Sequence, residues 1–316
     1  MTAYTPGMVL NTRNVVAGTL LDMAQTNPNI WVLTSDCGGN MKAFIERYPE
    51  RFVDTGIAEQ NAAGIAAGLA LSGAIPFIMG MTPFVTMRCF EQNRTAIAYQ
   101  NLPVRIIGWV GGMTSGGGST HYAMEDIAIM SAIANMQVVS ISDPQMCERL
   151  LRDSVHIPGP LFIRLTMAKA DPIVYPPDRA DFSFGKGIVI REGSDATLFT
   201  HGGMVHRAIK LADELASEGI ELRLVDMWTI KPLDEALVLN CVETTKRILV
   251  WEDHFMRGGL ASAIADCLID QGVSPRKFVR VGIPQIYPGF GPYDDLLKKY
   301  RMDEEAVKAT IRNIVK

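Results

Sequence analysis

Residues 51–80 read RFVDTGIAEQNAAGIAAGLALSGAIPFIMG, and this stretch decides the fold. From Gln60 to Met87 the chain contains no charged residue. A membrane-spanning helix needs about 20 predominantly apolar residues, and glycines and prolines divide this run into shorter pieces. We therefore expect a buried helix over 58–71, followed by a buried strand over 76–80.

Short apolar runs alternate with helical patterns on both sides of this stretch. Near-continuous apolar runs are typical of strands that are buried on both faces of a parallel sheet. Strands are expected at 30–36, 76–80, 104–110, 136–142 and 160–165, and helices at 12–25, 58–71, 83–100, 125–134 and 144–154. The last helix has a clear start, because Asp143 can cap it and Pro144 suits its first position. The alternation predicts the α/β class with doubly wound sheets.

A segment rich in Pro and Asp interrupts the alternation near residue 170, and its composition is typical of a linker. The same pattern then resumes. Strands are expected at 185–192, 196–202, 221–227, 247–253 and 277–283, and helices at 204–217, 234–244, 258–271 and from 303 onward. We therefore predict two α/β domains, at 1–170 and 185–316, joined by a linker at 171–184.

Composition excludes several classes of protein. The 316 residues carry 30 basic and 34 acidic side chains, a formal net charge of −4, so nucleic acid or an anionic membrane is not expected as the main partner. The five cysteines are far apart and form no CxxC pair, which argues against a zinc ribbon and for reduced thiols. The first residues lack the features of a signal peptide. A cytoplasmic location is expected.

Three loops follow predicted strands, where ligands of open α/β sheets bind. In the first, DTGIAEQ, Glu59 opens the uncharged helix. It is either an acid favoured by the helix N-terminus or a catalytic group. Because the helix is expected to be buried, the carboxylate needs a partner.

The second loop, VGGMTSGGGSTHYAMED at 110–126, is rich in glycine, which lets the backbone approach a ligand closely. His121 could shuttle protons or bind phosphate, or simply bond to backbone. The loop matches neither the GxGxxG nor the GxxxxGK[ST] pattern, so a nicotinamide or nucleoside triphosphate site is not expected.

The third loop, TPFVTMRCF, places Phe84, Met87 and Phe90 on one helical face. Such a stripe is usually part of the core. Arg164 ends a strand and Arg13 lies in the first helical turn, so each is either a solvated residue or a phosphate clamp.

Taken in order, these segments resemble the pyrimidine-binding and C-terminal domains of transketolase over essentially the whole chain. The segments that carry the resemblance are RFVDTGIAEQNAAGIAAGLALSG, the TPF that follows, and GSTHYAMEDIAIMSAIANMQVVSISD. The resemblance implies that Glu59 is catalytic and bonds N1′ of the aminopyrimidine of thiamine diphosphate. It also implies that Phe84 stacks on this ring, that Phe90 walls its pocket, and that Asp36 lies near the cofactor.

The resemblance also implies substrate contacts. His121 corresponds to a catalytic histidine that bonds the oxygens of the donor sugar, and Arg164 and Arg13 correspond to arginines that hold the substrate phosphate. The implied reaction of carbohydrate metabolism moves a two-carbon ketol unit from a ketose phosphate to an aldose phosphate such as glyceraldehyde 3-phosphate.

Half of the family's machinery is missing from this chain. The family binds Mg²⁺ and the diphosphate through a GDG…N motif, and the sequence contains no GDG. We therefore expect no metal site in this chain. An N-terminal partner subunit would carry the diphosphate and Mg²⁺, the assembly would be an α2β2 heterotetramer, and the chain alone would be inactive.

One departure bears on the substrate. Where common members read GEDG, this chain has Gly116–Gly118. Loss of the aspartate removes a bond to the sugar hydroxyls and opens space, which favours a branched donor such as apulose 4-phosphate. Two alternatives stay open: a β subunit of a 2-oxo acid dehydrogenase, although THYAMED differs from its QHSQ-like segment, and a non-catalytic paralogue.

Overall fold

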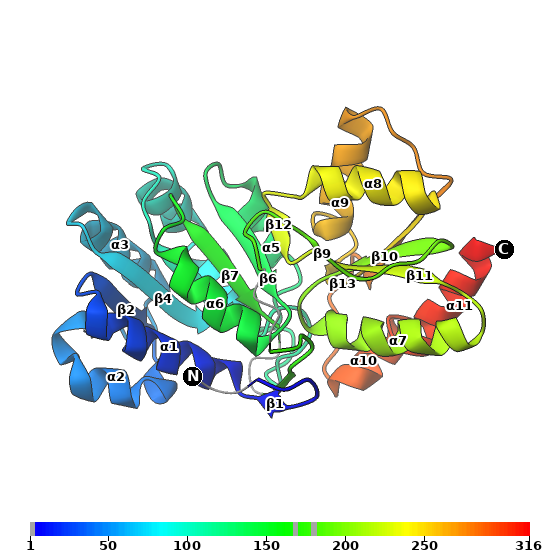
Figure 1. The fold of residues 1–316 in the computed structure, drawn as a ribbon. Coiled ribbons are helices and arrows are strands. Elements are labelled where there is room, and N and C mark those ends of the chain that lie inside the picture. Colours follow the sequence, from blue (N-terminus) through cyan, green and yellow to red (C-terminus); the bar gives the residue numbers. More distant parts are fainter. Residues whose placement is uncertain (1–3, 167–169, 178–181) are drawn as a thin grey trace.

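A computed structural model describes residues 4–166, 170–177 and 182–316, and these form two α/β units side by side (Figure 1). Each unit is a twisted sheet with helices on both faces, which confirms the predicted α/β class with doubly wound sheets. Within the described residues, the first sheet has the strand order β12-β6-β7-β5-β4-β2-β3 and the second β14-β13-β10-β11-β9.

The first sheet is parallel except at one edge. Its parallel strands are β2 (Ile30–Thr34), β3 (Phe52–Asp54), β4 (Ile75–Met81), β5 (Arg105–Trp109), β6 (Gln137–Ile141) and β7 (Leu161–Leu165). The central strands β5 and β7 are buried at every residue, as their continuous apolar sequences require. The predicted strands were therefore right, and only the three-residue β3 was missed.

Helices cover both faces of this sheet. They are α1 (Thr12–Thr26), α2 (Lys42–Arg47), α3 (Glu59–Leu71), α5 (Asp126–Ala132) and α6 (Pro144–Ser154). One apolar cluster joins α1, α2 and α6 to the sheet, and another joins α3 and α5 to the opposite face. No helix within the described residues combines the length and the hydropathy needed to cross a bilayer.

The predicted helix at 83–100 is irregular. Wide π-helical turns at Phe84–Arg88 and Asn93–Ala98 flank the short α4 (Phe90–Gln92). Wide turns change the register of the backbone hydrogen bonds, and Asn93 Nδ2 donates to the Val85 carbonyl at 2.9 Å. Such π-turns are frequent at functional sites.

The second unit contains the remaining elements. Its strands are β9 (Ile188–Arg191), β10 (Ala196–Thr200), β11 (Leu222–Asp226), β13 (Arg247–Phe255) and β14 (Lys277–Ile283), and its helices are α7 (Val205–Ser217), α8 (Glu235–Thr245), α9 (Leu260–Asp270), α10 (Tyr293–Lys299) and α11 (Glu304–Val315). Only β9 runs antiparallel. The sequence did not predict α10.

A short strand from the second half of the chain completes the first sheet. β12 (Thr229–Lys231) pairs antiparallel with β6, and the Ser140 amide donates to the Trp228 carbonyl at 2.8 Å. The two units therefore share a sheet edge. Three residues carry too little periodicity to reveal such a strand in a sequence.

The described part of the predicted linker is packed onto the first unit. β8 (Asp171–Pro172) pairs with β1 (Val9–Leu10), and Tyr175 is buried. Residues 178–181 of the linker lie outside the described residues.

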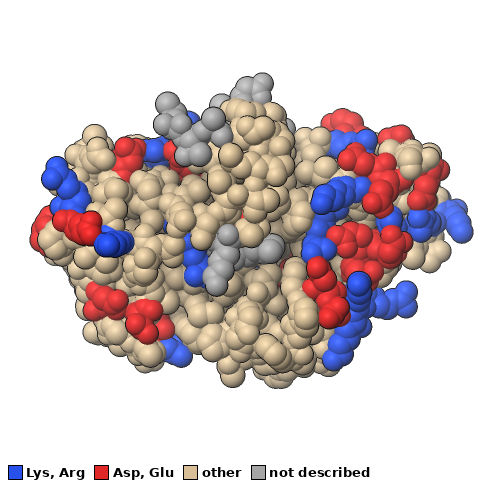
Figure 2. Space-filling view, turned by 90° about the horizontal axis from the view of Figure 1, so that it is seen from below, with Lys and Arg blue, Asp and Glu red and all other residues tan. Residues whose placement is uncertain are grey.

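On the face that Figure 2 displays, acidic and basic side chains lie beside one another toward the two ends of the molecule. The charges on this face form no extended basic surface of the kind that nucleic acid requires.

Asp143 fastens the linker to α6. As predicted, it caps this helix, accepting hydrogen bonds from the Gln145 and Met146 amides; it also accepts from the amides of Val174 and Tyr175 at 2.7 and 3.1 Å. One carboxylate thus satisfies four backbone donors.

We predict that Asp143→Ala lowers the free energy of unfolding by about 2–4 kcal/mol, because it removes a helix cap and leaves further buried amides unpaired. Urea denaturation of the chain measures this. Asp153→Ala on the same helix breaks only the exposed pair with Arg149, and should cost less than about 0.5 kcal/mol. Equal losses in the two variants would contradict the prediction.

Candidate active site

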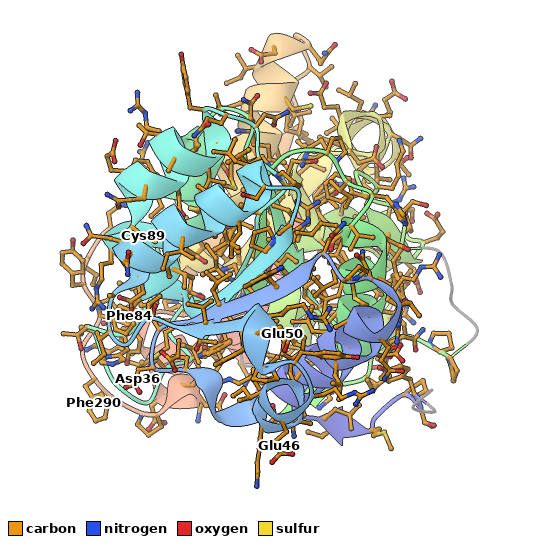
Figure 3. The ribbon with its side chains drawn as sticks, turned by 90° about the vertical axis from the view of Figure 1, so that its left-hand side faces the viewer. Asp36, Glu46, Glu50, Phe84, Cys89 and Phe290 are labelled. Carbon is orange, nitrogen blue, oxygen red and sulfur yellow. The ribbon has the colours of Figure 1, made fainter. Side chains whose placement is uncertain are left out.

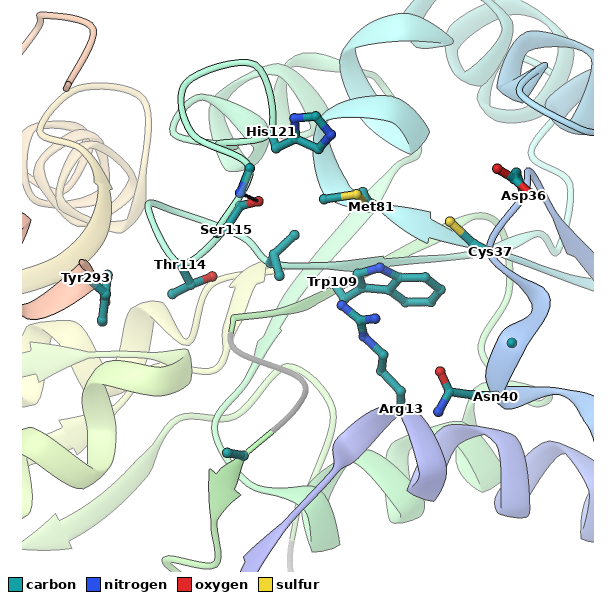
Figure 4. A pocket seen from close by; sticks show the side chains of 15 residues that line it. Arg13, Asp36, Cys37, Asn40, Met81, Trp109, Thr114, Ser115, His121 and Tyr293 are labelled. Atoms are coloured by element: carbon teal, nitrogen blue, oxygen red, sulfur yellow. Dashed lines mark hydrogen bonds between the residues drawn. The ribbon is translucent and has the colours of Figure 1, made fainter. Parts of the chain in front are cut away.

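A cavity of about 650 Å³ lies at the carboxyl ends of β2, β4 and β5 (Figure 4). This is where open α/β sheets bind their ligands. Its lining consists of Arg13, Asp36, Cys37, Gly39, Asn40, Met81, Trp109, Val110, Thr114, Ser115, Gly116, Gly117, His121, Ala170 and Tyr293. All of them precede residue 171 except Tyr293, which α10 contributes from the second unit.

Glu59 opens α3 beside this cavity and is only 3% exposed. The rest of α3 carries no charge, so the carboxylate needs a partner, as the sequence indicated. That partner is Arg88, whose Nη1 lies 2.6 Å from Glu59 Oε2. The sequence analysis did not single out Arg88.

Arg88 also covers an aromatic ring. Its guanidinium carbon lies 4.2 Å from the centroid of Phe84. The π-helical turn Phe84–Arg88 places both side chains on the same side of the segment. A planar, N–H-donating cation is thus stacked on an aromatic ring while it bonds to a buried carboxylate.

His121 lies on the edge of the same ring. The centroids of His121 and Phe84 are 5.3 Å apart in an edge-to-face arrangement. His121 Nδ1 shares a hydrogen bond with the Thr120 hydroxyl at 2.9 Å, and a Cβ on Gly117 would lie 2.7 Å from the imidazole. The structure therefore brings Glu59, Phe84 and His121 into one site.

Arg13 forms the opposite wall of the cavity. Its guanidinium carbon lies 4.7 Å from the Trp109 ring, and Figure 4 shows the two side chains stacked. Burial lowers the pKa of Arg13, and its Nε has no hydrogen-bond partner. A guanidinium held in this way can receive an anion from the cavity.

Asp36 and Cys37 line the cavity just after β2. Asp36 is exposed at φ 55°, with its amide bonded to Asp54 Oδ1 at 3.0 Å. Burial raises the pKa of the Cys37 thiol, which makes it a poor nucleophile. Asp36 lies on the same side of the molecule as Phe84 (Figure 3).

Arg164 does not reach the cavity, contrary to the expected phosphate contact. It is fully buried, with its Nε 2.6 Å from Asp126 Oδ2 and its Nη2 donating to the Asp253 carbonyl. An arginine whose charge is already paired in the interior is not available to a substrate. Its position assigns it to the packing between the two units.

Phe90 also differs from the expectation. Its half-buried ring packs against the apolar cluster that contains Ala63, Val85 and Ile127, and it is not part of the cavity lining. The stripe of Phe84 and Phe90 is therefore divided, because the π-turn between them changes the helical register.

Some of the site residues that were missed carry a signal in the sequence. Arg88 is the first charged residue after the uncharged run, and it stands four positions after Phe84. Asp253 ends an otherwise apolar strand, RILVWED. Tyr293 has no such signal, since only the packing of α10 brings it to the cavity.

The fold and the cavity define a class: a two-domain α/β protein with its ligand site at the carboxyl ends of parallel strands. Residues 9–171 match the family model of the transketolase pyrimidine-binding domain, and residues 185–307 match that of the transketolase C-terminal domain. The chain belongs to the transketolase family.

Individual relatives agree along nearly the whole chain. One of the two subunits of an apulose-4-phosphate transketolase from Phocaeicola vulgatus is 33% identical, and the match covers 96% of this chain and 97% of that subunit. A 6-deoxy-6-sulfo-D-fructose transketolase subunit, SqwH, from a Clostridium species is 35% identical and covers 94% and 92%. These matches support a C-terminal transketolase subunit better than a β subunit of a 2-oxo acid dehydrogenase.

A solved structure is similar in fold as well. It is described as a split-gene transketolase in an inactive β4 tetramer, and it matches with a TM-score of 0.86 at 35% identity, covering 98% of each chain.

We predict that Arg88→Met lowers the free energy of unfolding by about 1–2 kcal/mol, because it leaves the Glu59 carboxylate buried without its partner. The figure is modest since the Arg88 side chain is 39% exposed. Urea denaturation of the chain measures it. In a Glu59→Gln background the same substitution should cost less than half as much; an equal cost in both backgrounds would refute the pairing.

Proposed function

We propose that this chain is the C-terminal subunit of a thiamine diphosphate-dependent transketolase that works only with an N-terminal partner subunit. The reaction moves a two-carbon ketol unit from a ketose phosphate to an aldose phosphate such as glyceraldehyde 3-phosphate. The observation that carries this proposal is the stacked and paired guanidinium of Arg88 between Phe84 and Glu59.

The side chains here fit an aminopyrimidine. Arg88 acts as a stand-in for it, because both groups are planar, donate an N–H to a carboxylate and stack on an aromatic ring. Arg88 is 39% exposed, so its guanidinium can move toward solvent when the ring enters. Glu59 would then hold the proton shared with N1′, and Phe84 would hold the ring in plane.

When bound, thiamine diphosphate supplies the nucleophilic carbon that takes up the two-carbon unit and passes it on. The other side chains of the cavity bind the substrate. His121 would bond the oxygens of the donor sugar, and Arg13, held against Trp109, would bind its phosphate. Asp36 lines the cavity on the cofactor side.

A partner subunit is needed to hold the diphosphate. In the described residues, His, Cys, Asp and Glu form no group of three that could bind a metal ion, and the sequence lacks the GDG motif. Mg²⁺ is therefore assigned to the partner, in an α2β2 assembly. Two relatives are named as subunits, and a similar protein is described as inactive in its β4 state.

The space at Gly116–Gly118 supports a branched donor such as apulose 4-phosphate. A Cβ on Gly116 would meet nothing within 4 Å, whereas one on Gly117 or Gly118 would meet His121 or Phe290 at under 3.0 Å. Gly116 also lines the cavity. The extra room lies beside the histidine that contacts the donor.

We predict that Glu59→Ala abolishes transfer in the reconstituted two-chain complex, with a loss of more than about 100-fold, because no other described side chain in this site could take the proton of the ring. Coupled assay of aldose phosphate consumption measures it. The matched control is Glu46→Ala, since Glu46 projects from α2 away from the site (Figure 3).

The control should keep full activity, and both variants should still assemble with the partner in size-exclusion chromatography. Full activity of Glu59→Ala would overturn the proposal. A wild-type complex that assembles without transferring any two-carbon unit would instead favour the non-catalytic paralogue.

We further predict that Gly116→Asp lowers turnover of a branched ketose phosphate about tenfold or more, because it returns a charged side chain to the space beside the donor. Steady-state kinetics with branched and unbranched ketose phosphates measure the effect. Gly116→Asn, of equal size, separates volume from charge. An unchanged rate with the branched donor would refute the donor assignment.

A further inference from the structure

The mechanism proposed above does not use Asp253, an acid that is 1% exposed where β13 meets the first unit. Its carboxylate accepts the Met113 amide at 3.2 and 3.3 Å and the Tyr293 hydroxyl at 2.9 Å. It therefore joins the Gly-rich loop of the first unit to α10 of the second.

The carboxylate lies directly against the backbone of the loop. Gly112 has φ +76°, and a Cβ there would lie 2.1 Å from Asp253 Oδ2. Only a glycine allows this approach. Gly112 also exchanges two backbone hydrogen bonds with Ala123, at 2.7 and 3.0 Å, which close the loop between them.

A simple ion pair does not explain this burial. Arg164 is the cation nearest in the network, but its Nε pairs with Asp126, and only its Nη2 contacts the Asp253 carbonyl oxygen. Burial raises the pKa of the Asp253 carboxyl, while Arg164 and the hydrogen bonds from Tyr293 and Met113 oppose that rise. The carboxylate therefore serves the loop and the tyrosine.

The same loop carries the groups that face the substrate. Gly116 and His121 line the cavity, and Tyr293 lines it from the other unit. The tip of the loop is also supported by the second unit, since the Ser119 hydroxyl donates to the Pro288 carbonyl at 2.9 Å. Both the base and the tip of the loop thus depend on the C-terminal unit.

We propose that Asp253 is a positioning residue that fixes the base of the Gly-rich loop and the Tyr293 phenol, so that His121 is held against Phe84 at the donor site. This gives the C-terminal unit a role in the reaction, and it rests on the proposed function. Asp253 touches neither donor nor cofactor; it acts through the loop.

The test is Asp253→Asn in the chain assembled with its N-terminal partner. The amide keeps the volume but cannot accept both donors with full charge. We expect the KM for the donor to rise about tenfold or more, because a loop displaced by about 1 Å loses its productive geometry. Asp270→Asn, an exposed acid of the same unit, is the matched control and should leave KM unchanged.

A double-mutant cycle separates positioning from simple stability. If Asp253 acts through the loop, Asp253→Asn and His121→Ala together should lose about fivefold less than the product of the two single losses. Merely structural damage would reduce the active fraction, leave the KM of the surviving molecules unchanged and give independent losses. Independent losses, or an unchanged KM, would overturn the inference.

Hydrogen exchange gives a readout that does not require activity. In Asp253→Asn, the amides of residues 113–122 should exchange about tenfold faster, while those of β5 stay protected. Tyr293→Phe, which removes one hydroxyl, should show a smaller change and carries the test if the asparagine variant fails to assemble. If the wild-type complex shows no transferase activity, the proposed function fails, whereas exchange still decides whether Asp253 holds the loop.

Discussion

The site depends on one constraint: a carboxylate buried at the start of an uncharged helix must be compensated. Glu59 meets this constraint with Arg88, and Arg88 in turn covers Phe84. Desolvating a charge is costly unless it is paired, so the pair fixes the geometry of the π-turn, the aromatic ring and α3 together. The same arrangement offers a cofactor ring an acceptor and a stacking surface.

The two units are more dependent on each other than two domains joined by a linker. β12 completes the edge of the first sheet, and Asp253 and Pro288 hold the loop that faces the cavity. Tyr293 even contributes to the cavity wall. Transketolase membership thus describes a chain in which the second unit supports the ligand site of the first.

Strands such as 161–165 were predictable because five consecutive apolar or buried residues suit only a covered parallel sheet. The start of α6 was equally clear, since Asp143 and Pro144 are local signals. The π-turn at Phe84–Arg88 was not, because its register depends on a contact from Asn93. Arg164 was misjudged for a related reason: a strand-end arginine can face either a cavity or a buried acid.

The sequence by itself determined the class of fold, the family resemblance and the cluster of Glu59, Phe84 and His121, because these follow from local periodicity and from motifs within short stretches. Only the tertiary structure decided that Arg88 pairs with Glu59, that Arg164 is internal, and that Asp253 and Tyr293 reach the site. These contacts join residues 29 to 140 positions apart. Their formation depends on how the sheets pack, which no local pattern encodes.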